Sequence, residues 1–219
     1  YQRAAPPNAT YTFKHALIQD AAYASLLTSA RRENHARIAT VLEAQFPDIA
    51  EAEPGLLAHH FSAAALPEKA VGYWLKAGTR ALAQSAAAEA IAHLQRGLED
   101  LAGMPAGPER TMVDLQLNHA LGQAHLIAEG YSSANVERHL AHAIALCREL
   151  GHPPQTGPAT WGLWACYLVR GAYQSSRERS DALLVACERA DDPDGLLEAF
   201  MMAGIDRYYA AEMAEGDEY

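Results

Sequence analysis

A small residue recurs inside helical segments of this chain at nearly even spacing. It stands at Gly78, Gly122, Ala165 and Gly204, which gives intervals of 44, 43 and 39 residues. A glycine inside a helix costs roughly 1 kcal/mol relative to alanine. Close approach of a neighbouring backbone at each of these positions would explain the repetition. The spacing therefore predicts similar helical units that pack one after another.

Helical segments alternate with short breakers along the rest of the chain. Apolar side chains recur at three- and four-residue spacing, and half of the residues are hydrophobic, with alanine abundant. We interpret residues 1–10 as a loop and 11–13 as a short strand end. The spacing predicts helices starting near 13 and near 35, the second ending at Pro47, and a further helix up to 65. More helices are expected over 67–84, 86–101 and 195–211, and on either side of 130–133 and of 171–173.

Trp74 opens the clearest repeat. The pair Ala77–Gly78 follows three and four residues later, and Ala90 and Leu94 take matching places on the second helix. This pattern is typical of tetratricopeptide units. The fold class expected is all-α, a right-handed α-solenoid of tetratricopeptide-like hairpins with repeats of about 40–44 residues. The residues expected to pack between helices are Trp74, Ala77, Gly78, Ala90, Leu94, Leu121, Gly122, Leu140, Ala143, Trp161, Trp164, Ala165, Phe200, Ala203 and Gly204.

The charge distribution and the cysteines indicate which binding partners and which cellular compartment to expect. The net charge is −10, and the acids concentrate in residues 181–219, which argues against nucleic acid as a partner. We expect most of these acids, and the basic group Arg31, Arg32 and Arg37, on solvated helix faces. The three cysteines lie far apart and are expected to be buried and reduced, in a cytoplasmic protein. No signal-peptide pattern is visible in these residues, and we expect no apolar run among them to span a membrane.

No catalytic motif is present, and the histidines form no recognisable metal site. The adjacent pair His59 and His60 points to different helix faces, and His139 and His142 lack a ligand motif around them. Packing within the repeats is the simpler interpretation. A metal-dependent hydrolase that uses these histidines is kept as an alternative.

Four segments resemble one class of bacterial multidomain signalling protein. They are 11–46 (YTFKHALIQDAAYASLLTSARRENHARIATVLEAQF), 56–101, 130–150 (GYSSANVERHLAHAIALCREL) and 161–171 (WGLWACYLVRG). That class joins a class III adenylate/guanylate cyclase, a STAND-type AAA-like ATPase and C-terminal tetratricopeptide repeats. The resemblance implies that 1–50 is the end of the winged-helix arm of the ATPase, and that 54–219 is the repeat array with an incomplete last repeat.

The same resemblance sets the functional expectation. The cyclase and the phosphate loop would lie upstream, and no GxxxxGK[ST] occurs in this chain. We therefore expect no cofactor or metal in this segment, but ATP or ADP with Mg²⁺ in upstream domains of the parent. By resemblance, His15 lies where a winged-helix histidine can contact the phosphate of ADP.

The expected role is non-catalytic: a concave groove that binds a protein or peptide, or upstream domains of the same chain, and so controls the ATPase and its effector. Aromatic residues such as Trp161 and Trp164 pack between repeats or line that groove. A stand-alone adaptor and the repeat region of a STAND-type transcriptional activator are the alternatives. Self-association through the open C-terminal end is also expected to be feasible, and no membrane is expected as a partner.

Overall fold

The computed structural model describes residues 2–3, 10–11, 15–151, 156–190 and 192–216. Within these residues, helices dominate, and strand pairing is limited to a two-residue antiparallel ladder near the N-terminus. In chain order the elements are β1 Gln2–Arg3, β2 Thr10–Tyr11, α1 Ala16–Ser25, α2 Thr28–Gln45, α3 Pro47–Ala52, α4 Pro54–Ala63, α5 Pro67–Ala83, α6 Ala87–Leu101, α7 Pro108–Glu129, α8 Ala134–Glu149, α9 Thr156–Val169, α10 Tyr173–Ala190 and α11 Pro193–Gly216.

Proline and glycine fix many of the helix ends. Pro47, Pro54, Pro67 and Pro108 occupy the first turn of α3, α4, α5 and α7. Proline suits this position because its missing N–H would have no partner within the helix. A glycine with a positive φ of 79°, 74° and 73° follows α7, α8 and α9 respectively. Glycine adopts this conformation without the steric penalty that a side chain imposes.

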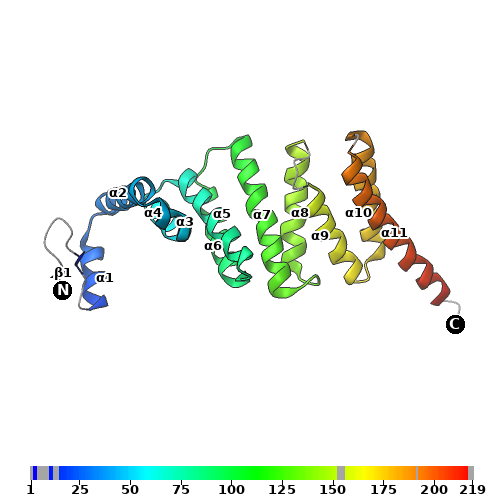
Figure 1. Ribbon diagram of the computed structural model, residues 1–219, viewed down its shortest axis with the longest axis horizontal. Helices are drawn as coiled ribbons and strands as arrows, with labels where there is room; N and C mark the ends of the chain where they lie inside the picture. The colour runs from blue at the N-terminus through cyan, green and yellow to red at the C-terminus, as the bar shows by residue number, and fades with distance from the viewer. Residues whose placement is uncertain (1, 4–9, 12–14, 152–155, 191, 217–219) are drawn as a thin grey trace.

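Consecutive helices pack against each other from α4 to α11. In addition, α5 contacts α7 and α9 contacts α11, as expected when hairpins stack. Figure 1 shows the helices in a row with the two termini at opposite ends. The predicted fold is confirmed: the protein is an all-α solenoid in which α5–α6, α7–α8 and α9–α10 are successive hairpins.

The core is a chain of apolar clusters rather than one centre. The first cluster joins α2, α3, α4 and α5 through Ala39, Ala50, Leu57 and Trp74. Three more follow along the array. Packing is thus continuous across residues 50–54, where we expected a boundary between two regions. The assignment of those regions to an ATPase arm and a repeat array stays a prediction.

Two of the recurring small residues lie at close helix approaches. A Cβ added to Gly78 would lie 2.4 Å from Cγ of Leu94, and one added to Gly122 would lie 2.4 Å from Cδ2 of Leu140. In both hairpins, the glycine is on the first helix and the leucine is on the second. The other predicted packing residues that are buried are Trp74, Ala77, Ala90, Leu121, Ala143, Trp164, Ala165 and Ala203.

The expectation of close packing is not met at the start of the fourth unit. Phe200 is 56% exposed, and a Cβ added to Gly204 would meet nothing within 4 Å. At Phe200 and Gly204 the physical reason is that α11 is followed by no other helix in the described part of the chain. In the third unit, Trp161 of α9 is half-buried because it lines a cavity beside α7.

The N-terminal region also differs from expectation. Pro47 ends α2 as predicted but also begins α3, which is too short to show periodicity. Of the strand end predicted at 11–13, Tyr11 lies in β2, whereas residues 12–13 lie outside the described part of the chain. Strand β1 falls in the segment that we interpreted as a loop.

The environment of the three cysteines agrees with the prediction that they are buried and reduced. The three cysteines are buried free thiols, and burial raises the pKa of each. Within the described residues, none of the helices combines the length and the apolar character that a membrane span requires.

Candidate protein-binding groove

Two adjoining cavities follow the face on which α5, α7 and α9 lie. One, of about 440 Å³, lies between α5 and α7, and the other, of about 340 Å³, lies between α7 and α9 and reaches α11. Both are lined by His119 and Gln123 of α7, so they lie side by side on one face that spans three hairpins. We call this pair of cavities the groove. Its lining residues are Gly72, Leu75, Lys76, Thr79, Gln116, His119, Ala120, Gly122, Gln123, Leu126, Leu140, Pro158, Trp161, Gly162 and Glu198.

The lining of the groove mixes apolar and polar side chains, and most of the polar ones line the cavity between α5 and α7. Lys76 lines the cavity beside α5 and forms an ion pair with Glu51, whereas Glu198 lies at the α11 end. In the middle, Nε2 of Gln123 lies 3.5 Å from Nε2 of His119. Burial lowers the pKa of His119, which keeps its ring neutral at pH 7. Neutral donors and acceptors beside apolar side chains suit a peptide, whose backbone needs hydrogen bonds and whose side chains need apolar contact.

One aromatic side chain, Trp161, both lines the groove and packs against neighbouring rings. Trp161 contacts the rings of Tyr131 and Trp164, with centroids 6.5 Å and 6.2 Å away, and it also lines the α9 part of the groove. Trp164 is buried in the core below. Of the two roles expected for these aromatic residues, Trp164 has the packing role and Trp161 has both.

His15 is an exposed residue at the start of α1, and its side chain makes no capping hydrogen bond. Residues 12–14 before it lie outside the described part of the chain. Its contact with a nucleotide phosphate stays a prediction.

A histidine cluster that we did not predict joins α1, α2 and α4. Nδ1 of His35 lies 2.7 Å from Nδ1 of His60, and Nε2 of His35 lies 2.9 Å from the hydroxyl of Tyr23. The ring of His59 is 5.7 Å from that of His35. Burial, with the neighbouring histidine charges, lowers the pKa of both His35 and His60. Periodicity within single helices does not predict this contact, because His35 and His60 lie on different helices and meet only where α2 packs on α4.

A cavity of about 720 Å³ lies beside this cluster between α1, α2 and α4. Arg31 and Arg37 line it together with apolar side chains. Arg31 donates from Nε to the carbonyl of Leu26 at 3.0 Å and lies 5.3 Å from the ring centroid of Tyr23. The expected basic face is therefore partly engaged with the protein itself, while Arg32 and Arg37 are exposed.

A second group of histidines is buried between α7 and α8. Nδ1 of His139 lies 2.8 Å from Oδ1 of Asn118, whose amide nitrogen donates to Asp114 at 2.6 Å. His142 lies 3.4 Å from Asp114, so a carboxylate that is remote in sequence does approach this histidine. His125 stacks on His139 with a centroid separation of 5.4 Å. Even so, no group of three side chains among the described residues is arranged to hold a metal ion.

One acid of the acidic C-terminal segment is buried, contrary to the expectation of solvated faces. Asp206 of α11 is 3% exposed and accepts hydrogen bonds from Trp164, Ser176 and Ser180 at 2.6–3.1 Å. These donors come from α9 and α10, so the carboxylate joins three helices. Asp100 accepts from the Trp74 indole in the same way at 2.9 Å. Such satisfied networks have a structural role.

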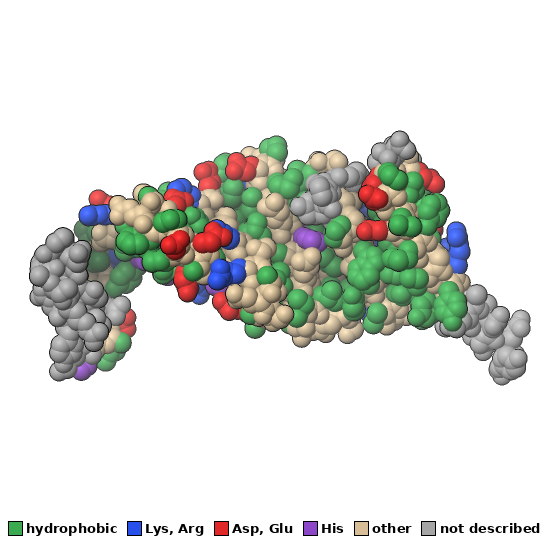
Figure 2. Space-filling model, in the orientation of Figure 1, with side chains coloured by type: hydrophobic (Ala, Val, Ile, Leu, Met, Phe, Trp, Pro, Cys, Tyr) green, Lys and Arg blue, Asp and Glu red, His purple; other side chains and the backbone are tan. Residues whose placement is uncertain are grey.

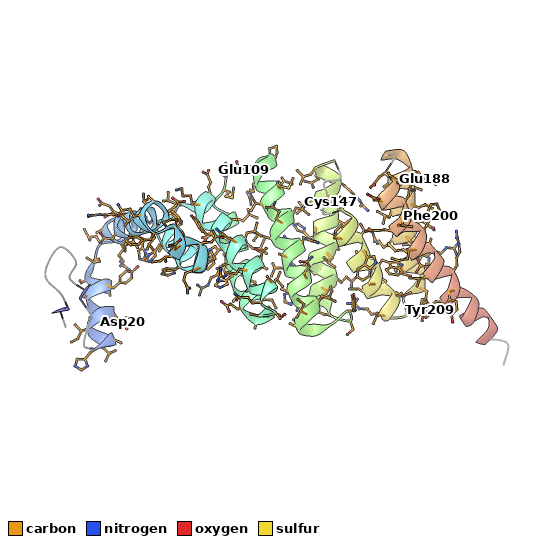
Figure 3. The ribbon with its side chains drawn as sticks, in the orientation of Figure 1. Asp20, Glu109, Cys147, Glu188, Phe200 and Tyr209 are labelled. Atoms are coloured by element: carbon orange, nitrogen blue, oxygen red, sulfur yellow. The ribbon has the colours of Figure 1, made fainter. Side chains whose placement is uncertain are left out.

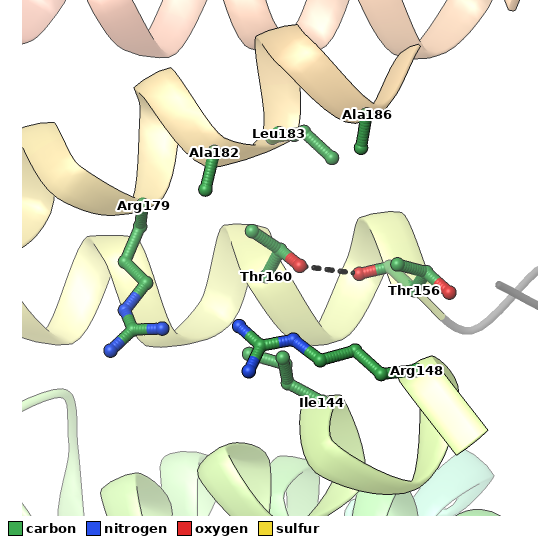
Figure 4. A pocket seen from close by; sticks show the side chains of 8 residues that line it. All are labelled: Ile144, Arg148, Thr156, Thr160, Arg179, Ala182, Leu183 and Ala186. Carbon is green, nitrogen blue, oxygen red and sulfur yellow. Dashed lines mark hydrogen bonds between the residues drawn. The ribbon is translucent and has the colours of Figure 1, made fainter. Parts of the chain in front are cut away.

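A smaller cavity, of about 60 Å³, lies between α8, α9 and α10 (Figure 4). Arg148 and Arg179 extend toward it, and Thr160 donates to the carbonyl of Thr156 at 2.7 Å along one wall. Its lining contains no acidic residue. It is too small for a peptide and is separate from the groove.

Comparisons with family models, known proteins and solved structures indicate which proteins are similar to this chain. No family model matches the chain, and no solved structure matches it. A protein of Rhizobium meliloti (strain 1021), described as uncharacterized, is 27% identical over 191 residues, which is 86% of this chain. The chain spans about 18% of the length of that relative.

Proposed function

We propose that this chain is a non-catalytic interaction segment that binds a protein segment in the groove. The observation that carries the proposal is that two cavities adjoin at His119 and Gln123 and together extend across successive hairpins. A groove of this kind offers a peptide several contact sites in register, since each hairpin contributes one.

The resemblance extends the proposal to a mechanism. In a bacterial signalling parent with a STAND-type ATPase and a nucleotidyl cyclase, the bound segment would be a partner protein or an upstream domain of the same chain. A ligand that prefers one arrangement of the arm and the array shifts the equilibrium toward that arrangement, and with it the activity of the ATPase. The great length of the Rhizobium meliloti relative supports a multidomain setting of this kind.

The test uses the full-length parent, with nucleotide turnover and effector output as the two measurements. Removing residues 54–219 is expected to change at least one of them under inducing conditions. The point variant Gln123→Arg, which places a long cation in the middle of the groove, is expected to give part of the same change. Gln95→Arg is the matched control because Gln95 is also an exposed helical glutamine but lies on α6, outside the groove.

If the truncated parent and Gln123→Arg both behave as the unaltered parent does, the regulatory proposal fails. A stand-alone adaptor would remain compatible with groove binding alone. The repeat region of a STAND-type transcriptional activator would show the same dependence, with DNA-binding output in place of cyclic nucleotide synthesis.

A further inference from the structure

Two arginine side chains from different hairpins meet at the small cavity between α8, α9 and α10. Arg148 lies in the last turn of α8, and Arg179 lies on α10. Both line the cavity, and Figure 4 shows their guanidinium groups directed into the space between the three helices. Cys147, the neighbour of Arg148, is labelled in Figure 3 and marks this place on α8. All three helices are followed by further described helices, so the cavity lies within the array rather than at its end.

The cavity holds two positive charges without an acid to balance them. Its other lining residues are uncharged: Ile144, Thr156, Thr160, Ala182, Leu183 and Ala186. Among the described residues, Arg170 and Arg177 form ion pairs, but neither Arg148 nor Arg179 does so. Residues 152–155, which connect α8 to α9 and lie outside the described part of the chain, include no acid in their sequence. The connection between these helices therefore supplies no counter-charge.

One N–H group at this cavity is buried and unpaired. Nε of Arg179 has no hydrogen-bond partner among the described residues. Such a donor costs free energy, because it has lost its hydrogen bond to water and has gained no acceptor in return. The hydroxyl of Thr160 is already used, since it donates to the carbonyl of Thr156 at 2.7 Å. An acceptor that carries negative charge satisfies the N–H and balances the two cations at the same time, whereas a water molecule does only the first.

We propose that this cavity binds a phosphate group, held between Arg148 and Arg179. Guanidinium groups bind phosphate oxygens through strong, charge-assisted hydrogen bonds. The volume of about 60 Å³ limits the ligand to a few heavy atoms, because one water molecule takes about 30 Å³ in the liquid. A tetrahedral phosphate has oxygens in several directions, so it reaches two arginines from separate helices better than a planar carboxylate does.

A bound phosphate connects α8 of the second hairpin with α10 of the third. It replaces the repulsion between two like charges with two attractive contacts, and so strengthens the packing between these hairpins. The cavity shares no lining residue with the groove, so this proposal does not depend on the proposed function. Free phosphate and a phosphate carried on a larger molecule, the rest of which lies outside the cavity, offer the same chemical group.

Isothermal titration calorimetry of the chain with inorganic phosphate tests the proposal. The titration is done near neutral pH in about 0.15 M NaCl, which screens weak attraction to surface charge. We expect saturable binding with a Kd below about 1 mM. Phosphoserine, titrated in the same way, distinguishes the sources: tighter binding than that of inorganic phosphate assigns the site to a phosphate on a larger molecule, and equal or weaker binding assigns it to free phosphate.

Variants of the chain locate the site. Arg148→Gln and Arg179→Gln each remove one guanidinium group and are expected to weaken phosphate binding at least about tenfold. Arg179→Lys keeps the charge but lacks the Nε–H, and we expect it to weaken binding as well. Arg177→Gln is the matched control, because Arg177 lies on the same helix and the charge change is the same, but its partner is Asp181 and it does not line the cavity.

Thermal unfolding separates ligand binding from a packing role of the arginines. Phosphate is expected to raise the unfolding temperature of the unaltered chain and to leave that of Arg179→Gln unchanged. In buffer without phosphate, Arg179→Gln is expected to unfold at the same temperature as the unaltered chain or higher, because the substitution removes both the repulsion and the unpaired N–H.

The proposal is wrong if phosphate does not bind saturably, or if Arg177→Gln weakens binding as much as Arg179→Gln does. Acetate that binds as tightly as phosphate would overturn the choice of a phosphate group. Full affinity in Arg179→Lys would mean that positive charge alone is enough and that the buried N–H has no part in binding. Loss of stability in Arg179→Gln without phosphate would assign this arginine to packing instead.

Discussion

At the scale of single residues, the hydrogen-bond partners of His139 determine which of its ring nitrogens carries the proton. Asn118 donates its amide N–H to Asp114, so its oxygen faces His139 and must accept. His139 therefore carries its proton on Nδ1. Its Nε2 lies 3.1 Å from NH2 of Arg138 and accepts from that group. A second proton on Nε2 would place two donors, both positively charged, against each other.

This arrangement predicts a stability loss in mild acid. Burial, followed by the charge of Arg138, lowers the pKa of His139 from 6.5 to about 4. At a pH between these two values, the unfolded chain binds a proton at His139 and the folded chain does not. This contribution to the free energy of unfolding is complete above pH 6.5 and decreases as the pH falls from 6.5 to about 4.

Urea unfolding at pH 7 and pH 5 checks this linkage. Between pH 7 and pH 5, the free energy of unfolding of His139→Gln is expected to decrease by about 1–2 kcal/mol less than that of the unaltered chain. Other histidines with lowered pKa values remain in both proteins, so the difference isolates His139. The same loss in both proteins would mean that this histidine is not held neutral by the fold.

At the scale of helices and hairpins, glycine has opposite effects at equivalent positions. Gly78 is needed because Leu94 occupies the space beside it, whereas Gly204 has no neighbour in the described residues. The spacing in the sequence located both positions, since it reflects a shared pattern along the first helices. It could not show that one is covered and the other is open, because coverage depends on the helix that follows.

Alanine substitution at the two glycines should therefore change stability in opposite directions. Gly78→Ala is expected to destabilise the chain by about 1–3 kcal/mol, because the new Cβ overlaps Cγ of Leu94. Gly204→Ala is expected to stabilise it by up to about 1 kcal/mol through helix propensity alone. The urea midpoints of the two variants measure both effects. A stabilising Gly78→Ala would remove the physical reason for the glycine pattern.

Other helix-scale features were beyond sequence reasoning for a common reason. Asp206 looks like a surface acid in an acidic segment, but Trp164, Ser176 and Ser180 from two other helices converge on it. His35 and His60 are likewise joined only by the packing of α2 on α4. Periodicity describes one helix at a time, so it predicted where helices lie and which faces are apolar. It carried no information about polar contacts between helices.

At the scale of the whole molecule, the solenoid has two surfaces of different character. The groove runs along α5, α7 and α9 and combines apolar lining with His119, Gln123, Lys76 and Glu198. Exposed apolar side chains of α11, the last described helix, form the other surface, among them Leu197, Phe200 and Met201. Figure 2 shows apolar side chains gathered over the α9–α11 end of the visible face. The sequence predicted a groove as a property of stacked hairpins and named Trp161 as a residue that could line it. The other lining residues were not predicted, because they come from alternate helices about 40 residues apart.

The most direct test of groove binding is site-specific photo-crosslinking in the full-length parent. Gln123 would be replaced by benzoylphenylalanine, with Gln95 on α6 replaced in the same way as the control. We expect irradiation to join position 123, but not position 95, to one discrete peptide of a partner or of an upstream domain. Crosslinks that are absent at 123, or that are equally frequent at both positions, would contradict it.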